Sequence, residues 1–600
     1  MATRKRVAVP HLPPAKAGGT PTCGRAPSKE KAMAVGSFCL VLHGHLPYVL
    51  RHGVWPHGED WLYEAAAETY LPLLATIDEC RFLNGNPRLT IGLTPILLEQ
   101  LSQDYFKHGF ERYLDDRIRR ARSDHAEFKK TGQAHLAYLA TRWEQFYTKL
   151  GEQFAGIGRD IPQAYAAQAA SGAVQILTSM ATHPFAPLLL EDSSVRAQIR
   201  AGLASSERVL GFRPRGLWLP ENGYRPSGQW WPPIPWGGAR IRPGLEHLVA
   251  DEGITHFFVE HHLIEQSRSE WVNNGDGLWH KVTWDEAPNN PQRGWRSVHE
   301  PAYVNSDGTA VPRAAAMARD PKICEQVWSG ACGYPANGTY LEFHKKHGER
   351  RGLRYWKITG TGIDLGRKDP YYPDDVQGRI FEHARHFCNQ VRERLHEYRR
   401  RTGRPGVVTA CFDAELFGHW WFEGPRFLKD VMLTLNADPD VDLATAEGYL
   451  KAHPPDKLVS LPAGSWGEGG DHRVWANDKT AWMWEVEYRC ETIFGKLTFG
   501  LPWQKRRQLR EVLQKAAREL LLLQASDWPF VITRGQAIDY GIKRFTQHVA
   551  RFECLTDIAE KLGSDSEYLG KLSEIEKFEV QDADIHDTVF PRVDLAWWNA

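Results

Sequence analysis

The chain has 600 residues, which is too long for one small core and predicts two to four domains or one large barrel with insertions. Lysine plus arginine and aspartate plus glutamate both number 74, so the formal net charge is zero, which argues against DNA or another polyanion as a partner. No apolar run reaches the roughly 18 residues that a membrane helix needs, and the nine cysteines form no CxxC pair or zinc-like spacing, which predicts reduced thiols in a cytoplasmic protein.

Residues 1–35 are rich in proline, glycine, alanine and basic residues, and Glu30 is their only acidic residue. A segment of this composition buries too little apolar surface to fold, so we predict a disordered extension. No apolar region follows the basic start, so a secretory signal is not predicted.

Short apolar runs of strand length recur along the rest of the chain, and stretches with helical spacing separate them. The predicted strands are 37–42, 88–93, 174–178, 216–219, 255–259 and 407–412. The predicted helices are 195–210, 243–252 and 374–400, with a charged helical insertion at 101–170 and a mainly helical region at 480–560. Stretches rich in proline and glycine at 226–244 and 289–313 are predicted as loops. This alternation predicts a parallel sheet, open or closed into a barrel.

Polar side chains follow several of the predicted strands. His43 and His45 come after the first strand, His183 after 174–178, Glu221 after 216–219, and Asp413 after 407–412. In a barrel of parallel strands the carboxyl ends of the strands carry the chemistry. These residues are therefore the first candidates for a functional site.

Two of these candidates are carboxylates in aromatic surroundings. Glu221 lies in GLWLPENGY, and Asp413 lies in ACFDAELFGHWWFEGP. Because burial raises a carboxyl pKa, the pair could be the acid and the nucleophile of a glycosidase. The alternative is that both are structural and accept backbone hydrogen bonds, and Glu415 and Glu423 compete with Asp413 for the acid role.

The His43-x-His45 pair leaves two interpretations open. Two imidazoles at a strand end are typical of the first ligands of a metal-dependent hydrolase such as a deacetylase, although further ligands in a recognisable spacing are not found. Alternatively, His43 is a neutral hydrogen-bond donor to a sugar hydroxyl or to the nucleophile. The 23 tryptophans favour a sugar site, and SWGEGGDHRVWANDKTAWMW (465–484) is predicted to be a ligand-facing loop.

From about Gly36 to near its C-terminus the chain resembles glycoside hydrolase family 57, in particular the 1,4-α-glucan (glycogen) branching enzyme subgroup. Five segments carry the resemblance in the same order: LHGHLPYV, QILTSMATHPFAPLL, GLWLPENGY, ACFDAELFGHWWFEGP and SWGEGGDHRVWANDKTAWMW. Each motif alone is weak, but the ordered set is specific.

The resemblance implies an α/β fold, a distorted (β/α)7 barrel over 36–460 with the helical insertion at 101–170, and a mainly helical domain over 461–600 that closes the active site. It implies that Glu221 is the nucleophile, that Asp413 is the general acid/base, and that no metal or cofactor is needed. The implied substrate-binding residues are His43, His45, Trp61, His183, Arg319, Trp328, Ala336, Trp466, Trp475 and Asp527. Ala336 stands where the family usually has glycine, so a position with positive φ would be strained there. A shielding loop is expected near 290–313, with Tyr303 as its candidate tyrosine.

The implied reaction is retaining cleavage of an α-1,4-glucan, which serves as donor and acceptor, and transfer of the segment to a 6-hydroxyl to form an α-1,6 branch. The alternatives are a 4-α-glucanotransferase or α-amylase of the same family, a glycogen-binding protein without turnover, and a metal-dependent hydrolase that uses His43 and His45. A nucleic acid or membrane partner is not expected, and the sequence does not define the oligomeric state.

Overall fold

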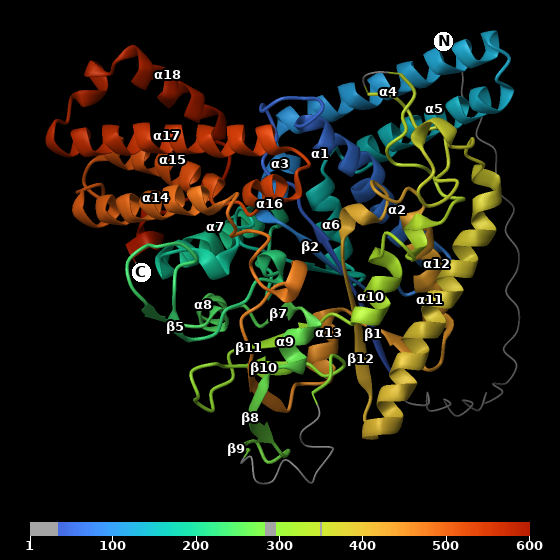
Figure 1. Cartoon of the computed structure of the whole chain (residues 1–600), viewed down its shortest axis with the longest axis horizontal. Coiled ribbons are helices and arrows are strands. Elements are labelled where there is room, and N and C mark those ends of the chain that lie inside the picture. The colour runs from blue at the N-terminus through green and yellow to red at the C-terminus, as the bar shows by residue number, and fades with distance from the viewer. Residues whose placement is uncertain (1–33, 283–295, 349–350, 600) are drawn as a thin grey trace, which may run out of the picture. The chain divides into compact units, whose positions relative to one another are not determined.

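Figure 1 presents the computed structural model of the chain, which describes residues 34–282, 296–348 and 351–599. The predicted disorder of residues 1–35 therefore falls almost entirely outside the described residues. None of the described helices combines the length and the apolar character needed to cross a bilayer. The eight cysteines in the described part of the chain are free thiols.

Parallel strands in the predicted positions form the centre of the fold. One run of paired strands has the order β12-β1-β2-β3, and a second run continues as β4-β7-β11. All neighbours within these two runs are parallel. The strands are β1 (Gly36–Gly44), β2 (Leu89–Leu93), β3 (Val174–Leu177), β4 (Gly216–Leu217), β7 (His256–Val259), β11 (Ala314–Ala318) and β12 (Gly406–Asp413).

Two joints make this seven-stranded arrangement a distorted barrel. A parallel bridge between Thr178 and Leu217 connects β3 to β4. Between β11 and β12 the described residues form no ladder, but the Asp320 amide donates to the Thr409 carbonyl at 2.9 Å. The predicted distorted (β/α)7 architecture is therefore correct, with an open seam at β11 and β12.

The alternation of side chains along β1 decides which residues point into the barrel. All nine residues of β1 are buried, as expected for a parallel strand that is covered on both faces. Phe38, Leu40 and Leu42 belong to the cluster that packs under the surrounding helices. Cys39 and Val41 belong to an inner cluster with residues of the opposite strands, among them Trp218, Phe258 and Met317. Because successive side chains alternate, His43 points to the inner side.

Helices surround the strands, and most lie where the sequence predicts them. The predicted insertion consists of α3 (Pro95–Ser102), α4 (Asp104–Lys130), α5 (Ala134–Gly156) and α6 (Ile161–Ala170), and α4 and α5 lie side by side in Figure 1. It follows α1 (Glu59–Ala65), the π-helical turn η1 (Ala66–Tyr70) and α2 (Leu71–Phe82). The remaining barrel helices are α7 (Asp192–Leu210), α8 (Leu245–Asp251), α9 (His261–Glu265), α10 (Pro321–Trp328), α11 (Pro373–Thr402), α12 (Gly424–Ala437) and α13 (Ala446–Ala452).

The prediction of loops at 226–244 and 289–313 was in part wrong, because both stretches contain strands. Residues 226–244 include the hairpin of β5 (Gly228–Trp230) and β6 (Arg240–Arg242). Residues 302–304 form β10 (Ala302–Val304), which pairs with β11 and with β14 (Lys457–Ser460), while residues 289–295 lie outside the described part. Strands of three residues flanked by proline and glycine are too short to show a period-2 pattern. The other short strands are β8 (Arg268–Asn273), β9 (Trp279–Lys281) and β13 (Val441–Leu443).

The C-terminal region is helical, as predicted. It contains α14 (Ala481–Gly500), α15 (Arg507–Leu523), α16 (Asp527–Arg534), α17 (Ile538–Ser564) and α18 (Glu574–Ala583). In Figure 1 α14, α15 and α17 run alongside one another, and α16 lies at the end that faces the barrel. One hydrophobic cluster extends from Phe38 of β1 to Trp598, so these helices share a core with the barrel.

Candidate active site

The predicted site residues converge at the carboxyl ends of the parallel strands. His43 of β1 and Asp413 of β12 are direct neighbours in the register of the two strands. Glu221 follows β4 and is connected by hydrogen bonds to Trp466 and Ser526. Residues from distant parts of the sequence are thus brought to one end of the barrel, as the strand-end rule predicts.

Glu221 occupies a strained position in the turn that follows β4. Its φ is 60°, a left-handed conformation that is uncommon for residues with a side chain and that is often found at functional sites. Its Oε2 accepts from the Trp466 indole at 2.7 Å, and its Oε1 accepts from the Ser526 hydroxyl at 2.9 Å. Burial raises the pKa of Glu221, whereas these two donors favour the anion and oppose the rise. The carboxylate is therefore fixed in direction, and its two hydrogen bonds limit the rise in pKa that burial causes.

A chain of polar contacts extends from Glu221 into the barrel. The Ser526 hydroxyl lies 3.1 Å from His183 Nδ1, and His183 Nε2 lies 3.0 Å from His43 Nε2. The His43 ring stacks on Trp218 with 4.7 Å between ring centroids. Burial, followed by the neighbouring histidines, holds the pKa of both His43 and His183 well below the ordinary value. Neutral imidazoles can donate one hydrogen bond and accept another, which suits them to orient the carboxylate.

His45 connects the barrel to the C-terminal helices. Its Nε2 lies 3.0 Å from Asp527 Oδ2, its Nδ1 lies 3.1 Å from Thr94 Oγ1, and its backbone amide donates to Glu415 Oε1 at 3.1 Å. Burial disfavours the charged ring, but Asp527, Glu221 and Glu415 together hold the pKa of His45 above its ordinary value. The predicted contact residues His45 and Asp527 thus bind each other at the edge of the site.

Asp413 is the last residue of β12 and has the environment of a proton donor. Burial, then the negative charges of Glu415 and Glu221, raise its pKa well above the ordinary value of an aspartate, and Arg319 opposes the rise. This environment favours the protonated form of the carboxyl group. The two carboxyl groups are therefore differentiated, since Glu221 has donors that favour the anion and Asp413 has neighbours that favour the acid.

The two competing glutamates have structural partners. Glu415 is buried, and its Oε1 accepts from the His45 amide and the Tyr70 hydroxyl. Glu423 is buried and accepts from the Leu341 amide at 3.2 Å and the Tyr371 hydroxyl at 2.5 Å. Glu415 therefore fixes the backbone of His45 at the site, whereas Glu423 binds the loop that contains Leu341.

The predicted binding residues divide between the site and other places. Trp466 binds Glu221, and Arg319 forms an ion pair of 2.6 Å with Glu260 beside Asp413. Trp475 is only 1% exposed and stacks on Phe185 with 4.2 Å between ring centroids.

Three further predicted residues lie outside this hydrogen-bonded cluster. Trp61 packs against His57 and Tyr540. Trp328 is 49% exposed and faces Trp420 edge-on. Ala336 ends a 3-10 turn and is not among the residues with positive φ, so the strain expected from a glycine replacement is absent at this described residue.

Two other expectations concern residues away from the carboxylates. Tyr303 lies in β10 with its ring edge-on to Trp279, so its assignment as the shielding tyrosine stays a prediction. For a metal, the described side chains offer three groups whose donor atoms come close enough to share an ion, and neither His43 nor His45 belongs to any of them.

Sequence reasoning missed two residues of the site. Glu260 immediately follows β7 and binds Arg319, so the strand-end rule could have found it. Ser526 precedes α16 in the C-terminal region, far from any strand. Its only signal is its place next to Asp527 in SDWPF.

Comparisons with known proteins show the family of this chain. Residues 39–293 match the family model "Glycosyl hydrolase family 57", and residues 490–598 match "1,4-alpha-glucan branching enzyme, C-terminal". A 1,4-alpha-glucan branching enzyme of Thermococcus kodakarensis is 36% identical over 549 residues, which cover 91% of this chain and 77% of that protein.

Solved structures give the same result. The crystal structure of a GH57-type branching enzyme from Pyrococcus horikoshii superposes with a TM-score of 0.82 at 33% identity. The match covers 94% of this chain and 97% of that chain. The crystal structure of an alpha-amylase from Thermotoga maritima superposes with a TM-score of 0.76 at 27% identity. The match covers 95% of this chain and 99% of that chain.

Proposed function

Because this chain belongs to the 1,4-alpha-glucan branching enzymes of glycosyl hydrolase family 57, we propose that Glu221 is its nucleophile and Asp413 its general acid/base. The observation that carries the assignment is a difference between two buried carboxyl groups at one end of the barrel: hydrogen-bond donors oppose the rise of the Glu221 pKa, whereas neighbouring carboxylates add to the rise of the Asp413 pKa. Glu221 accepts from Trp466 and Ser526, which favour the anion. Asp413 is buried beside Glu415 and Glu221, which favour the acid.

In the first step Glu221 attacks the anomeric carbon of an α-1,4-linked glucose. The bond between this carbon and the 4-oxygen of the leaving chain breaks, and Asp413 transfers its proton to that oxygen. The product is a covalent glycosyl-enzyme with inverted configuration. The hydrogen bonds from Trp466 and Ser526, one to each oxygen, keep the Glu221 carboxylate oriented during the attack.

Formation of the ester also changes the acidity of Asp413. The charge of Glu221 is one of the causes that raise the Asp413 pKa, and this charge disappears when the ester forms. The Asp413 pKa then falls, so Asp413, which has just lost its proton, can act as a base. It accepts the proton of a glucan 6-hydroxyl while that oxygen attacks the anomeric carbon and releases Glu221. Two inversions give an α-1,6 branch with net retention.

We further propose that an α-1,4-glucan serves as both donor and acceptor. The alternatives of the same family differ only in what attacks the intermediate. Attack by water would make the enzyme an amylase, and attack by a 4-hydroxyl of a glucan would make it a 4-α-glucanotransferase.

Incubation with amylose, with and without EDTA, distinguishes these outcomes when α-1,6 linkages are followed by proton NMR and reducing ends are counted. We expect new α-1,6 signal, few new reducing ends, and no effect of EDTA. Without α-1,6 signal, new reducing ends would indicate an amylase, and altered chain lengths with few new reducing ends would indicate a 4-α-glucanotransferase. Loss of activity with EDTA would indicate a metal-dependent hydrolase.

Variants test the two assignments directly. Glu221→Gln and Asp413→Asn should each lower the branching rate by about a thousandfold or more, because each removes a group that acts in both steps. Glu207→Gln, at an exposed position of α7, is the matched control and should leave the rate unchanged. Retention of more than a tenth of the rate in either active-site variant would contradict its assignment.

A further inference from the structure

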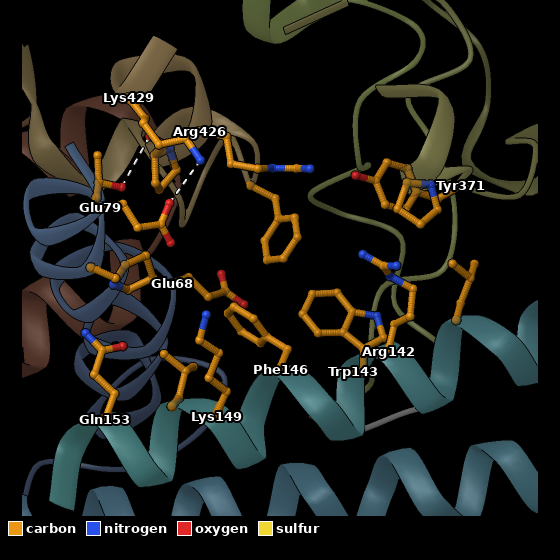
Figure 2. A pocket seen from close by; sticks show the side chains of 18 residues that line it. Glu68, Glu79, Arg142, Trp143, Phe146, Lys149, Gln153, Tyr371, Arg426 and Lys429 are labelled. Atoms are coloured by element: carbon orange, nitrogen blue, oxygen red, sulfur yellow. Dashed lines mark hydrogen bonds and ion pairs between the residues drawn. The ribbon is translucent and has the colours of Figure 1, made fainter. Parts of the chain in front are cut away.

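A cavity of about 380 Å³ lies outside the candidate active site, between α2, α5 and the first turns of α12. Figure 2 shows its lining, with Trp143, Phe146 and Lys149 on one wall, Glu68 and Glu79 on a second, and other residues facing them. Sites of this size hold small organic molecules. We propose that this cavity binds a nucleoside phosphate, that is, a flat aromatic ring that carries an anionic group.

Aromatic rings form the apolar part of the cavity. The Trp143 ring lies 5.5 Å from Phe146 and 5.1 Å from Phe422, and Phe146 lies 5.4 Å from Phe422. The Trp143 indole is fixed because it donates to the Arg354 carbonyl. Phe146 and Phe422 are partly exposed, so their faces are accessible from the cavity. A flat ring can stack on such a surface, and the protein loses little side-chain entropy on binding because the Trp143 ring is already fixed.

Four basic side chains surround these rings: Arg142, Lys149, Arg426 and Lys429. In Figure 2 the guanidinium groups of Arg142 and Arg426 extend into the cavity from opposite walls. Lys429 forms an ion pair of 2.9 Å with Glu79.

The remaining charges do not balance. Glu68, the other acidic residue of the lining, is paired at 2.7 Å with Arg354, which lies outside the lining. Arg142 lies 3.6 Å from a carboxylate oxygen of the exposed Asp374 and donates to the Tyr138 hydroxyl at 3.2 Å. Lys149 and Arg426 form no ion pair with any carboxylate of the described residues. The cavity thus has a surplus of positive charge, which an anion would complement.

The same lining is poorly suited to a glucan chain. Sugar hydroxyls need polar groups that are free to donate and accept, but both lining carboxylates are engaged in ion pairs. The neutral polar groups are engaged as well, since Gln153 donates to the Leu71 carbonyl and Thr76 to the Pro425 carbonyl. The combination of aromatic rings and surplus positive charge therefore favours an aromatic anion over a second glucan site.

Isothermal titration calorimetry with adenosine 5′-monophosphate on the full chain tests the proposal. We expect one site per chain with an affinity in the micromolar to millimolar range, and weaker binding of adenosine or inorganic phosphate alone, by at least about tenfold. Lys149→Ala and Arg426→Ala should each weaken binding by about tenfold, since each removes a charge that contacts the anion. Lys149 is exposed, so its variant should fold normally.

Controls separate this site from the catalytic one. Lys129→Ala, which removes an exposed lysine near the end of the neighbouring helix α4, should bind as the unmodified chain does. Glu221→Gln should also bind normally, so a failure of the catalytic assignment would leave this test intact. The proposal would be overturned by no detectable binding at millimolar nucleotide, by equal binding in the Lys149 and Arg426 variants, or by displacement of the nucleotide with maltohexaose.

Discussion

Ser526 offers one hydroxyl group to two residues of the site. It donates to Glu221 Oε1 and lies within hydrogen-bond distance of His183 Nδ1. Because a hydrogen bond to a carboxylate stabilises the anion, Ser526 holds the pKa of Glu221 below the value that burial alone would give. The nucleophile must be ionised in the free enzyme, so Ser526 influences the acidic limb of the pH profile of kcat/KM.

We therefore predict that Ser526→Ala moves the acidic limb of kcat/KM to higher pH. The rate at the optimum should fall about tenfold, since hydrogen bonds to charged groups contribute about 1.5–3 kcal/mol. Branching assays over a range of pH values measure both effects. Ser526→Thr keeps the hydroxyl and should leave the limb near its original position. An unchanged limb in the alanine variant would show that the hydroxyl does not control the ionisation of Glu221.

Glu415 influences the other limb. Asp413 must be protonated in the free enzyme, and after burial the charge of Glu415 is the largest cause that raises its pKa. Glu415→Gln removes this charge, so the Asp413 pKa should fall and the basic limb of kcat/KM should move to lower pH. Glu423→Gln is a matched control, because Glu423 is an equally buried glutamate that does not contribute to the Asp413 pKa. A basic limb that stays in place in Glu415→Gln would contradict this role.

At the scale of elements, burial on both faces determined which strands could be predicted. β1 and β12 are buried along almost their whole length and mostly apolar, so the sequence shows them as continuous runs, and residues at their carboxyl ends reach the site. The hairpin of β5 and β6 was missed because each strand has three residues and one face in solvent.

Tertiary contacts decided the rest of the site, and local sequence does not encode them. Ser526 reaches Glu221 from the start of α16, and no strand pattern indicates it. Trp475 lies in a stretch rich in tryptophan and glycine, but its ring packs into the core against Phe185. Aromatic content alone does not distinguish a ring that faces a ligand from one that is buried.

A buried polar cluster joins α15 and α17. His548 lies 2.7 Å from Glu519 through Nδ1, and its Nε2 accepts from Arg544 at 2.9 Å. Both ring nitrogens are thus satisfied in the neutral form, with Nδ1 as the donor to Glu519. Burial is the main cause that lowers the His548 pKa to about 3, and Glu519 opposes the shift. An added proton on Nε2 would break the bond from Arg544.

This cluster predicts acid-sensitive stability. In the unfolded chain a histidine has a pKa of about 6.5, so between about pH 3 and 6.5 the unfolded state binds a proton that folded His548 excludes. Stability should therefore decrease as the pH falls through this window. In His548→Gln the midpoint of thermal unfolding should decrease less between pH 7 and pH 5. His396→Gln, at a partly exposed histidine paired with Asp440, should keep the full decrease. An equal decrease in both variants would contradict the prediction.

At the scale of the whole molecule, the described C-terminal helices supply both core and site. One hydrophobic cluster includes Phe38 of β1 and Leu520 of α15, and the site takes Ser526 and Asp527 from the start of α16. A separate unfolding of these helices would expose the barrel side of the shared core. It would also remove a donor from Glu221. Barrel and helices should therefore unfold as one cooperative unit, with loss of activity in the same temperature range.

Leu520→Ala tests this cooperativity, because Leu520 is fully buried in α15 and far in sequence from the barrel. The change should destabilise the fold by about 2–5 kcal/mol, the usual range for a buried leucine truncated to alanine. Calorimetric scans should show a single transition at lower temperature, and residual branching activity should be lost over the same range. Leu83→Ala, at a position that is 54% exposed, should leave the transition nearly unchanged. Two resolved transitions with activity retained after the first would contradict the prediction. The helices would then unfold independently of the barrel, and Ser526 and Asp527 would not be essential to the site.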